Sequence, residues 1–384
     1  MANPQIIGEG TYGCVAKPSL TCNQKKPINY QNKVSKIMVK KYAESEYEEM
    51  RDISSIPGIG KYIVPMPELC RPNDDSHFKE AMKSCENKKF KSTSRNNFRL
   101  LIFEDGGLNL KQFTTDILPT LSTQDLCIFL TKVTDLIEGL GFFNKNNIIH
   151  HDIKTRNIVY NIETAVIKYI DFGLVYKKSD FIRDSTNSTN TMAQSWDNFP
   201  PEYKYANQDA FALNKSAFTL SYIPFIEKVA YTFDSYSLGI AMVTVMNEIN
   251  KYKWDVDLAQ IQSFFEIMGN KNISSRDYDV FKLPVMYKQI LTSAGIWTTL
   301  SPKPQKNSIL LQNKLIMKNK YLFSNEPPTA LKACDASKER NPITQRCVKK
   351  CLNHQRRTKH FKCRRKRKSV KKKNNTASSS RTKN

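Results

Sequence analysis

The chain has 384 residues, of which 40% are hydrophobic and 10% aromatic, and its formal net charge is +24. This length allows two domains, or one large bilobal domain with an appendage, and the composition is ordinary for a folded globular protein. The start of the chain lacks the basic and apolar regions of a signal peptide, and the longest apolar run, 238–246, is too short to cross a bilayer. We therefore expect an intracellular protein that is not secreted and has no transmembrane segment.

Charge and cysteine are both unevenly distributed. Residues 331–384 hold 20 Lys and Arg against two acidic residues, which leaves only +6 for residues 1–330. The basic character thus belongs to a tail. Five cysteines are scattered, as expected of free thiols in a reducing compartment, whereas four cluster near the C-terminus. The scattered cysteines are Cys14, Cys22, Cys70, Cys85 and Cys127, and the clustered ones are Cys334, Cys347, Cys351 and Cys363.

The first 40 residues predict β-structure around a glycine-rich turn, in which Gly8, Gly10, Gly13 and Val15 give the pattern G-x-G-x-x-G-x-V. The glycine spacing also fits a dinucleotide-binding turn, but such a turn must open a helix, and here the strand continues until Pro18. A hairpin that covers phosphates fits better, because glycines let backbone N–H groups approach phosphate oxygens. The next predicted strand, 32–40, carries Lys36, whose ammonium can neutralise α- and β-phosphates when a carboxylate holds it.

A helix is predicted over 42–56, because apolar residues recur at helical spacing until Pro57 and Gly58 end it. This helix offers two carboxylates that could hold Lys36. Glu49 precedes apolar residues at +1, +4 and +7, and Glu46 lies one turn earlier on the same face. The pattern favours Glu49, with Glu46 as the alternative.

The elements that follow alternate between loops, strands and helices. Residues 67–97 are polar and predict an inserted loop, and an apolar strand then runs over 98–104 until two glycines stop it. Ser122 with Asp125 resembles a capping box that opens a helix over 122–143. A hairpin is predicted to end at Asp171, and 234–249 is apolar nearly all round, as in a buried helix. Strands first and helices later predict an α+β body with two lobes.

The stretch "IIHHDIKTRN" (148–157), followed fourteen residues later by "DFG", resembles the catalytic machinery of protein kinases. The family's catalytic loop reads H-R-D-x-K-x-x-N, and His150, Asp152, Lys154 and Asn157 fall on those positions. The resemblance covers residues 5–250 and implies a bilobal protein kinase-like fold. It also implies that ATP and Mg²⁺ are the cofactors and that proteins are the substrates.

The resemblance implies a role for each matched residue. Asp152 would accept or orient the substrate hydroxyl proton, and Lys154 would steady the γ-phosphoryl group. Asn157 and Asp171 would hold Mg²⁺, which prefers oxygen ligands. Phe103 resembles the gatekeeper. The residues implied to bind the nucleotide are Ile7, Gly8, Gly10, Gly13, Val15, Lys36, Glu49, Glu104, Gly106 and Asp171.

Further positions bear on regulation and specificity. His151 occupies the slot where many kinases carry an arginine that pairs with a phosphorylated activation loop, so we expect activity that does not depend on that phosphorylation or is only weakly coupled to it. His150 is expected to have a structural role, and Asp234 is expected to anchor the backbone of the catalytic loop. Ser195 and the "PPE" of 200–202 resemble the end of the activation segment. Together with Lys154, they favour serine/threonine specificity.

The tail contains "CDASKERNPITQRCVKKC" (334–351), which resembles the two-cysteine adaptor segment of large nucleocytoplasmic DNA viruses. This implies an adaptor-mediated protein partner and an iridovirus-like origin, with the host cytoplasm, the nucleus or the virion as the location. Zinc ligation by the tail cysteines and histidines is an alternative, although the spacing matches no well-defined zinc pattern. The basic runs 364–368 and 371–373 predict a disordered tail, with nucleic-acid binding or nuclear import as alternatives.

The sequence therefore predicts a protein kinase domain over 1–325, with the N-lobe to about 105 and the C-lobe over 106–325. An adaptor-like segment over 330–352 and a basic tail over 353–384 follow. The predicted activity is Mg²⁺-dependent transfer of the γ-phosphate of ATP to Ser or Thr of proteins. The alternatives are a pseudokinase that acts as a scaffold and a nucleic-acid-binding protein that uses the tail.

Overall fold

The computed structural model divides the chain into two units, Met1–Leu315 and Ile316–Asn384. The residues that the structure describes are 3–10, 12–24, 27–87, 90, 93–187, 196, 198–297, 338–340, 347–349, 355–357 and 363–365. The last four ranges are short strands of the second unit, β11 to β14, which pair antiparallel as β11 with β12 and β13 with β14. The cysteine, zinc, adaptor and nucleic-acid predictions for the tail rest on side chains that lie outside the described residues.

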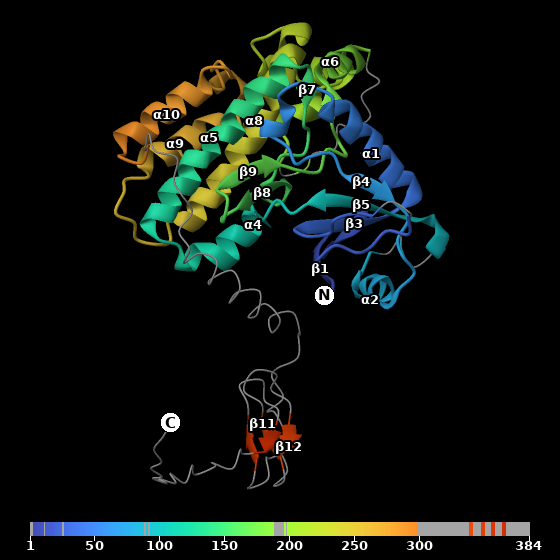
Figure 1. Ribbon diagram of the computed structural model, residues 1–384. Helices are drawn as coiled ribbons and strands as arrows, with labels where there is room; N and C mark the ends of the chain where they lie inside the picture. Colours follow the sequence, from blue (N-terminus) through green and yellow to red (C-terminus); the bar gives the residue numbers. More distant parts are fainter. Residues whose placement is uncertain are drawn as a thin grey trace, which may run out of the picture. The chain divides into compact units, whose positions relative to one another are not determined.

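The N-terminal lobe is built on an antiparallel five-stranded sheet in the order β1-β2-β3-β5-β4. Its strands are β1 Gln5–Glu9, β2 Gly13–Lys17, β3 Lys33–Val39, β4 Glu68–Cys70 and β5 Phe98–Glu104. Helix α1 (Lys40–Ser54) packs on one side of this sheet and helix α2 (Ser76–Ser84) on the other (Figure 1). The predicted glycine-rich hairpin, the lysine-bearing strand and the helix after it are therefore present.

The inserted segment 67–97 is not the loop that its polar composition predicts. It contains β4 and α2, and Asp75 caps α2 by accepting a hydrogen bond from the backbone N–H of Phe78 at 2.9 Å. The apolar residues Phe78, Ala81 and Phe90 are buried against the sheet, beside Phe98. A few well-spaced apolar residues were enough to form a second layer, although polar residues outnumber them.

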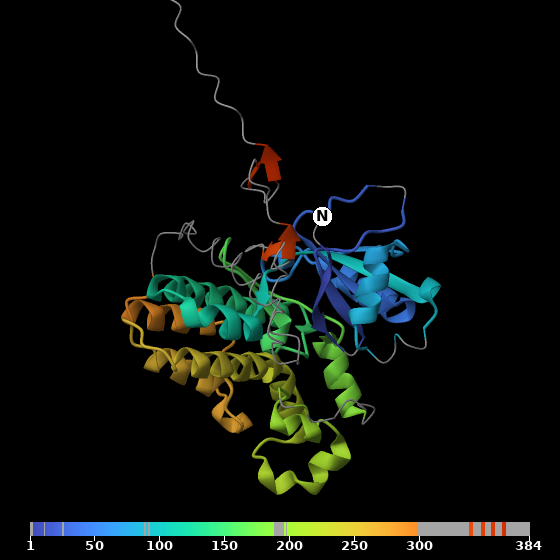
Figure 2. The same cartoon turned by 90° about the horizontal axis from the view of Figure 1, so that it is seen from below.

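The C-terminal lobe is mostly helical, with small sheets on the side that faces the N-terminal lobe (Figures 1 and 2). Its helices are α4 Leu110–Gln112, α5 Thr123–Lys145, α6 Lys178–Thr186, α7 Gln208–Leu213, α8 Tyr222–Ile249, α9 Ala259–Met268 and α10 Leu283–Ser293. Its strands are β6 Leu108–Asn109, β7 Ile148–Ile149, β8 Ile158–Asn161, β9 Val166–Tyr169 and β10 Tyr176–Lys177. The sheet β6-β8-β9 includes the predicted hairpin, and the main core lies among α5, α8, α9 and α10.

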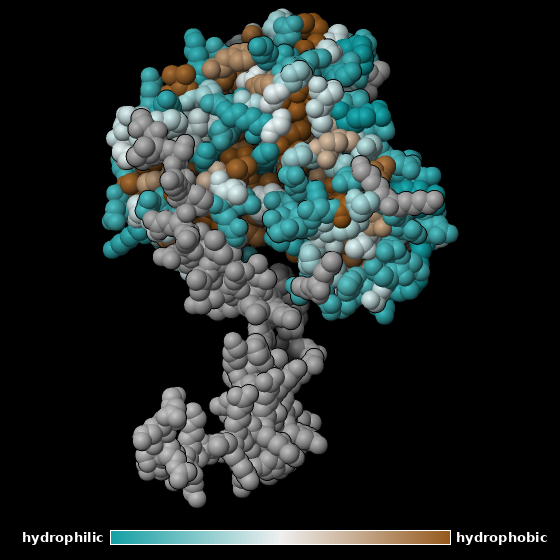
Figure 3. Space-filling model, viewed as in Figure 1, coloured by the Kyte–Doolittle hydropathy of each residue, from teal (hydrophilic) through white to brown (hydrophobic). Residues whose placement is uncertain are grey.

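Helix α8 begins twelve residues before the predicted start at 234. Its first turns bury Phe225, Ile226 and Val229 in a cluster with residues of the segment that precedes it. Among the described residues, α8 alone has the length and apolar composition of a membrane-spanning helix, but most of its side chains are buried within the lobe. On the face drawn in Figure 3, hydrophilic residues cover most of the first unit and hydrophobic residues show in small groups.

Four of the five scattered cysteines form disulfide bonds, so the prediction of free thiols is wrong for them. Cys14 is bonded to Cys85 and Cys22 to Cys70, across sequence separations of 71 and 48 residues. Cys127 is a free cysteine in α5. The pairs form because the layer made by 67–97 covers the hairpin and the loop after it, which brings distant cysteines together.

Candidate active site

The glycine-rich hairpin forms one wall of the site. Its turn is closed by a 2.9 Å hydrogen bond from the N–H of Gly10 to the carbonyl of Gly13. A Cβ added to Gly13 would lie 2.3 Å from the carbonyl oxygen of Ile37, so only glycine allows β2 to approach β3 this closely. Ile7 is 39% exposed and Val15 partly exposed. Of the predicted nucleotide contacts in this hairpin, Ile7, Gly8, Gly10 and Val15 are at least partly exposed, whereas Gly13 is buried against β3.

Lys36 in β3 is held by two carboxylates. Its Nζ lies 2.7 Å from each carboxylate oxygen of Glu46 and 3.1 Å from Oδ1 of Asp171. Burial works against the charged ammonium, but Asp171 and Glu46 outweigh it and raise the pKa of Lys36 above its ordinary value. Attraction to Lys36 lowers the pKa of Asp171 despite burial. The structure thus joins the N-terminal lobe to the predicted metal-binding aspartate through Lys36.

The prediction that Glu49 holds Lys36 is wrong, and the alternative, Glu46, does so. Glu46 shares the buried face of α1 with Ala43 and Met50, at helical spacings of three and four residues. Glu49 is half-buried, and its Oε1 accepts a hydrogen bond from Ser45 Oγ at 3.1 Å. The spacing of apolar residues in the sequence shows which face of α1 is buried, but it does not distinguish two glutamates that lie about one turn apart, such as Glu46 and Glu49.

The catalytic loop brings three predicted residues together. Lys154 Nζ lies 2.9 and 2.7 Å from the two carboxylate oxygens of Asp152. Asn157 Nδ2 donates to Asp152 Oδ2 at 2.7 Å and to the Asp152 carbonyl at 2.9 Å. The N–H of Ile170 donates to the Asn157 carbonyl at 2.9 Å, which places Asp171 beside this loop. Because both side-chain bonds of Asn157 use its amide nitrogen, the amide oxygen is left as a ligand atom.

The connection between the lobes lies against β8. A Cβ added to Gly106 would be 2.6 Å from Cγ2 of Val159, so glycine is needed for this contact. Glu104 ends β5, and Phe103 before it is partly buried. β5 pairs with β3, with Leu101 opposite Lys36 and Glu104 opposite Lys33, so the predicted nucleotide-binding residues Glu104 and Gly106 follow the strand that lies beside Lys36.

Asp234 in α8 holds the backbone of the catalytic loop through hydrogen bonds. Its carboxylate accepts hydrogen bonds from the backbone N–H groups of His150 and His151, at 2.7 and 3.0 Å. Burial raises the pKa of Asp234 to about 7, and these two bonds oppose the rise. His150 Nε2 lies 3.2 Å from the carbonyl oxygen of Ile170, and its ring centroid is 4.4 Å from that of Phe172. The expected structural roles of Asp234 and His150 agree with this geometry.

His151 lies in an aromatic cluster that anchors the segment after the catalytic loop. Its ring centroid is 4.9 Å from that of Phe199, 4.7 Å from Phe233 and 5.4 Å from Tyr203. Only 2% of the residue is exposed, and burial lowers its pKa to about 4. A neutral ring packed among aromatic rings occupies the slot where a charged arginine would contact a phosphate.

We expect His151 to make the protein less stable in acid. Between its ordinary pKa near 6.5 and its folded value of about 4, the unfolded chain binds a proton that the folded chain does not. Stability is therefore lost as the pH falls through this range. His151→Phe keeps a ring and removes the titration. When the pH is lowered from 7.5 to 5, the free energy of unfolding of the wild type should fall by about 2 kcal/mol more than that of the variant.

Urea unfolding of both proteins at the two pH values measures this change. The backbone at His151 has a φ of 68°, so phenylalanine adds strain there, but this strain does not depend on pH. Asp234 titrates in both proteins, and its contribution cancels in the comparison. An unchanged difference between the two pH values would contradict the prediction.

Of the residues predicted to end the activation segment, Ser195 and 200–202, the structure describes only 200–202, and Ser195 lies outside the described residues. Asn198, which the sequence did not single out, places Nδ2 at 3.4 Å from Asp152 Oδ1. Glu202, the last residue of "PPE", forms a buried ion pair with Arg276. No motif marks Asn198, so its position next to Asp152 could be found only from the fold.

The donor set of the site fits a nucleotide with a magnesium ion. Asn157 and Asp171 offer hard oxygen ligands beside each other, and Lys36 offers a fixed positive charge next to them. The glycine-rich turn leads into β2, which pairs with β3 so that Val15 lies opposite Lys36, and its glycines leave backbone N–H groups without a side chain in front of them. Positive charge, oxygen ligands and an open backbone are the groups that phosphoryl transfer requires.

Comparisons with known proteins agree with this geometry. The model of the protein kinase domain family matches residues 1–267. The chain is 25% identical to cyclin-dependent kinase-like 2 of Rattus norvegicus over 173 residues, which are 44% of this chain and 28% of that protein. It is 25% identical to CTD kinase subunit alpha of Saccharomyces cerevisiae over 269 residues, 70% of this chain and 41% of the yeast protein.

A shorter match, 39% identical over 46 residues, relates it to serine/threonine-protein kinase Kist of Homo sapiens and covers 12% of this chain and 11% of the human protein. The chain spans less than a third of the length of the cyclin-dependent kinase-like 2 proteins that it matches. The family model, by contrast, covers well over half of this chain, including the N-terminal lobe, the C-terminal lobe as far as α9, and every predicted site residue. The chain belongs to the protein kinase family.

Proposed function

We propose that this protein transfers the γ-phosphate of ATP to serine or threonine hydroxyls of protein substrates. The observation that carries the proposal is that the two halves of the site are assembled together. Lys36 contacts both Glu46 and Asp171, while Asp152 contacts both Lys154 and Asn157. A scaffold that had lost catalysis would not need to keep these contacts.

In the proposed mechanism each residue acts through its charge and position. Asp152 accepts or orients the proton of the incoming hydroxyl, and Lys154 stabilises negative charge on the phosphoryl oxygens. Lys36, which Glu46 holds in place, neutralises the α- and β-phosphates, next to the γ-phosphate that is transferred. Asn157 and Asp171 would hold Mg²⁺, which would supply further neutralisation of phosphate charge. The hairpin excludes water above the phosphates, which strengthens all of these charge interactions.

Serine/threonine specificity rests on two observations. Lys154 follows Asp152 by two residues and contacts its carboxylate, and the Kist match is to a protein named as a serine/threonine-protein kinase. The proposed independence from phosphorylation of the activation segment rests on His151, which is uncharged and packed among aromatic rings. Adaptor-type partners, nucleic-acid binding and viral origin remain predictions from the sequence.

A phosphotransfer assay with γ-³²P-ATP tests the proposal. We expect the purified full chain to label itself or a basic protein on serine or threonine when Mg²⁺ is present, and not when Mg²⁺ is removed. Lys36→Met should abolish the label, because the phosphates lose their fixed cation. Prior phosphatase treatment should leave the rate unchanged. Label on tyrosine would overturn the specificity, and ATP binding without any label would favour the scaffold.

A further inference from the structure

The segment 67–97, which we call the insert, contacts the glycine-rich hairpin from outside the site. It adds β4 to the edge of the sheet and lays α2 across the sheet face opposite α1. It is bonded covalently at two points, through Cys85 to the hairpin strand β2 and through Cys70 to the loop that follows β2. This arrangement raises the question of what the insert does to the hairpin.

The part of the insert that directly follows α2 is bonded to the hairpin strand itself. Cys85 directly follows α2, and Cys14 lies in β2 between Gly13 and Val15. Side chains alternate along a strand, so Cys14 points away from the face on which Gly13 and Val15 lie. Cys14 is fully buried, and its Cα lies 6.1 Å from that of Cys85. The disulfide thus holds the phosphate-covering hairpin from its outer side.

The residues after Cys85 reach the turn of the same hairpin. The backbone N–H of Glu86 donates to Glu9 Oε1 at 3.1 Å, and Asn87 Nδ2 donates to the carbonyl of Gly10 at 2.7 Å. The Glu9 carboxylate also lies within 4.8 Å of both sulfur atoms of the disulfide. One short stretch of the insert therefore fixes both strands of the hairpin and the first residue of its turn.

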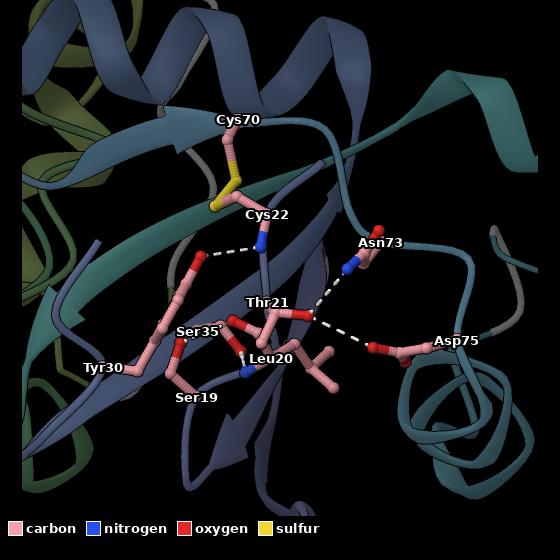
Figure 4. The surroundings of a disulfide bond; sticks show 9 residues. All are labelled: Ser19, Leu20, Thr21, Cys22, Tyr30, Ser35, Cys70, Asn73 and Asp75. Atoms are coloured by element: carbon pink, nitrogen blue, oxygen red, sulfur yellow. Dashed lines mark hydrogen bonds between the residues drawn. A yellow bond between two sulfur atoms is a disulfide. The ribbon is translucent and has the colours of Figure 1, made fainter. Parts of the chain in front are cut away.

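The Cys22–Cys70 bond lies near the N-terminal end of the insert (Figure 4). It joins the loop after β2 to the end of β4. The Cys22 N–H donates to the Tyr30 hydroxyl at 2.8 Å, and Thr21 Oγ1 donates to Asp75 Oδ2 at 3.1 Å. Backbone bonds between 21–23 and 71–73 reinforce the junction. This end is held by several hydrogen bonds besides its disulfide, and among the described residues those bonds reach 21–23 and Tyr30 instead of Glu9 or Gly10.

We propose that the insert positions the glycine-rich turn for the phosphates of ATP, and that the Cys14–Cys85 bond makes this positioning sensitive to thiol reductants. Cys85, Glu86 and Asn87 act as positioning residues through the hairpin. The inference rests on the proposed function, in that the turn binds ATP. A turn held in its binding conformation loses less conformational freedom when the ligand binds, so opening the bond weakens ATP binding.

The redox step is a thiol–disulfide exchange. A dithiol reductant donates two electrons and two protons, its own sulfurs become a disulfide, and Cys14 and Cys85 become thiols. In the reverse direction a low-molecular-weight disulfide accepts two electrons and two protons from the pair and leaves as two thiols. In a reducing compartment the bond forms only where an oxidant of this class is present.

Two matched double variants of the full chain test the proposal. Cys14→Ser with Cys85→Ser removes the bond at the turn, and Cys22→Ser with Cys70→Ser removes the bond at the far end. We expect the first pair to raise the Kd for a fluorescent ATP analogue and the KM for ATP by about fivefold, with kcat changed less than about twofold. The second pair should stay within about twofold of wild type in both constants, although both variants melt at lower temperature.

Wild type in dithiothreitol should behave as the first variant does. Intact mass after alkylation without reductant should show that Cys14, Cys22, Cys70 and Cys85 are protected. Equal rises in KM for the two variants would mean general weakening of the lobe and would overturn the inference, as would alkylation of Cys14 and Cys85 in the untreated protein. Wild type that binds no ATP analogue overturns the proposed function, whereas ATP affinity unchanged by the loss of the Cys14–Cys85 bond overturns only the role of that bond.

Discussion

Asp152→Asn should lower kcat for phosphotransfer about a thousandfold while ATP affinity stays within about twofold of wild type. The Asp152 carboxylate receives the ammonium of Lys154 and the amide N–H of Asn157 at 2.7 Å each. Asparagine has the same shape but no charge, so it neither accepts the proton of a substrate hydroxyl nor balances Lys154. A thousandfold loss corresponds to about 4 kcal/mol of transition-state stabilisation.

Steady-state kinetics with saturating ATP measure kcat, and a fluorescent ATP analogue measures binding separately. The matched control is Asp277→Asn, the same chemical change at a carboxylate whose side chain is 96% exposed, and it should behave as wild type. Melting temperatures identify any general loss of folding. A variant that kept a tenth or more of the wild-type kcat would remove Asp152 from the proposed role.

Glu46→Gln should reduce kcat/KM for ATP about a hundredfold, whereas Glu49→Gln should stay within about twofold of wild type. Glu46 is buried and holds the Lys36 ammonium through both of its carboxylate oxygens. Removing the Glu46 charge leaves the buried Lys36 ammonium with Asp171 as its remaining partner at 3.1 Å, and loss of one partner of a buried ion pair typically costs about 3 to 5 kcal/mol. Part of that loss should appear in kcat/KM for ATP, because Lys36 is then held less firmly in the position where it meets the phosphates.

Glu49→Gln is the matched control, because it makes the same change one turn along the same helix, where the carboxylate instead accepts a hydrogen bond from Ser45. Comparing the two variants by kcat/KM therefore separates the ion pair from any general effect on α1. If Glu49→Gln were the more damaging change, the arrangement of Lys36 described above would be wrong for the active protein.

Much of the site could be predicted because its parts are local in the sequence. Asp152, Lys154 and Asn157 lie within six residues, and the hairpin turn around Gly10 needs only its own glycines. The structure brings both groups together with Lys36 and Asp171, as the order of the motifs implied. The choice between Glu46 and Glu49 was missed because a helix repeats every 3.6 residues, so neighbouring turns present similar faces.

The sequence by itself determined the family, the order of the elements and the residues that carry the chemistry, since each depends on side chains a few positions apart. Only the tertiary structure decided that the polar insert folds onto the sheet and that Cys14 meets Cys85. A disulfide requires two Cα atoms within about 7 Å of each other, and spacing along the chain does not reveal which distant cysteines satisfy this. Packing of the insert brings those two cysteines within reach of each other. The resulting disulfide joins the glycine-rich hairpin to the layer that covers the sheet face opposite α1.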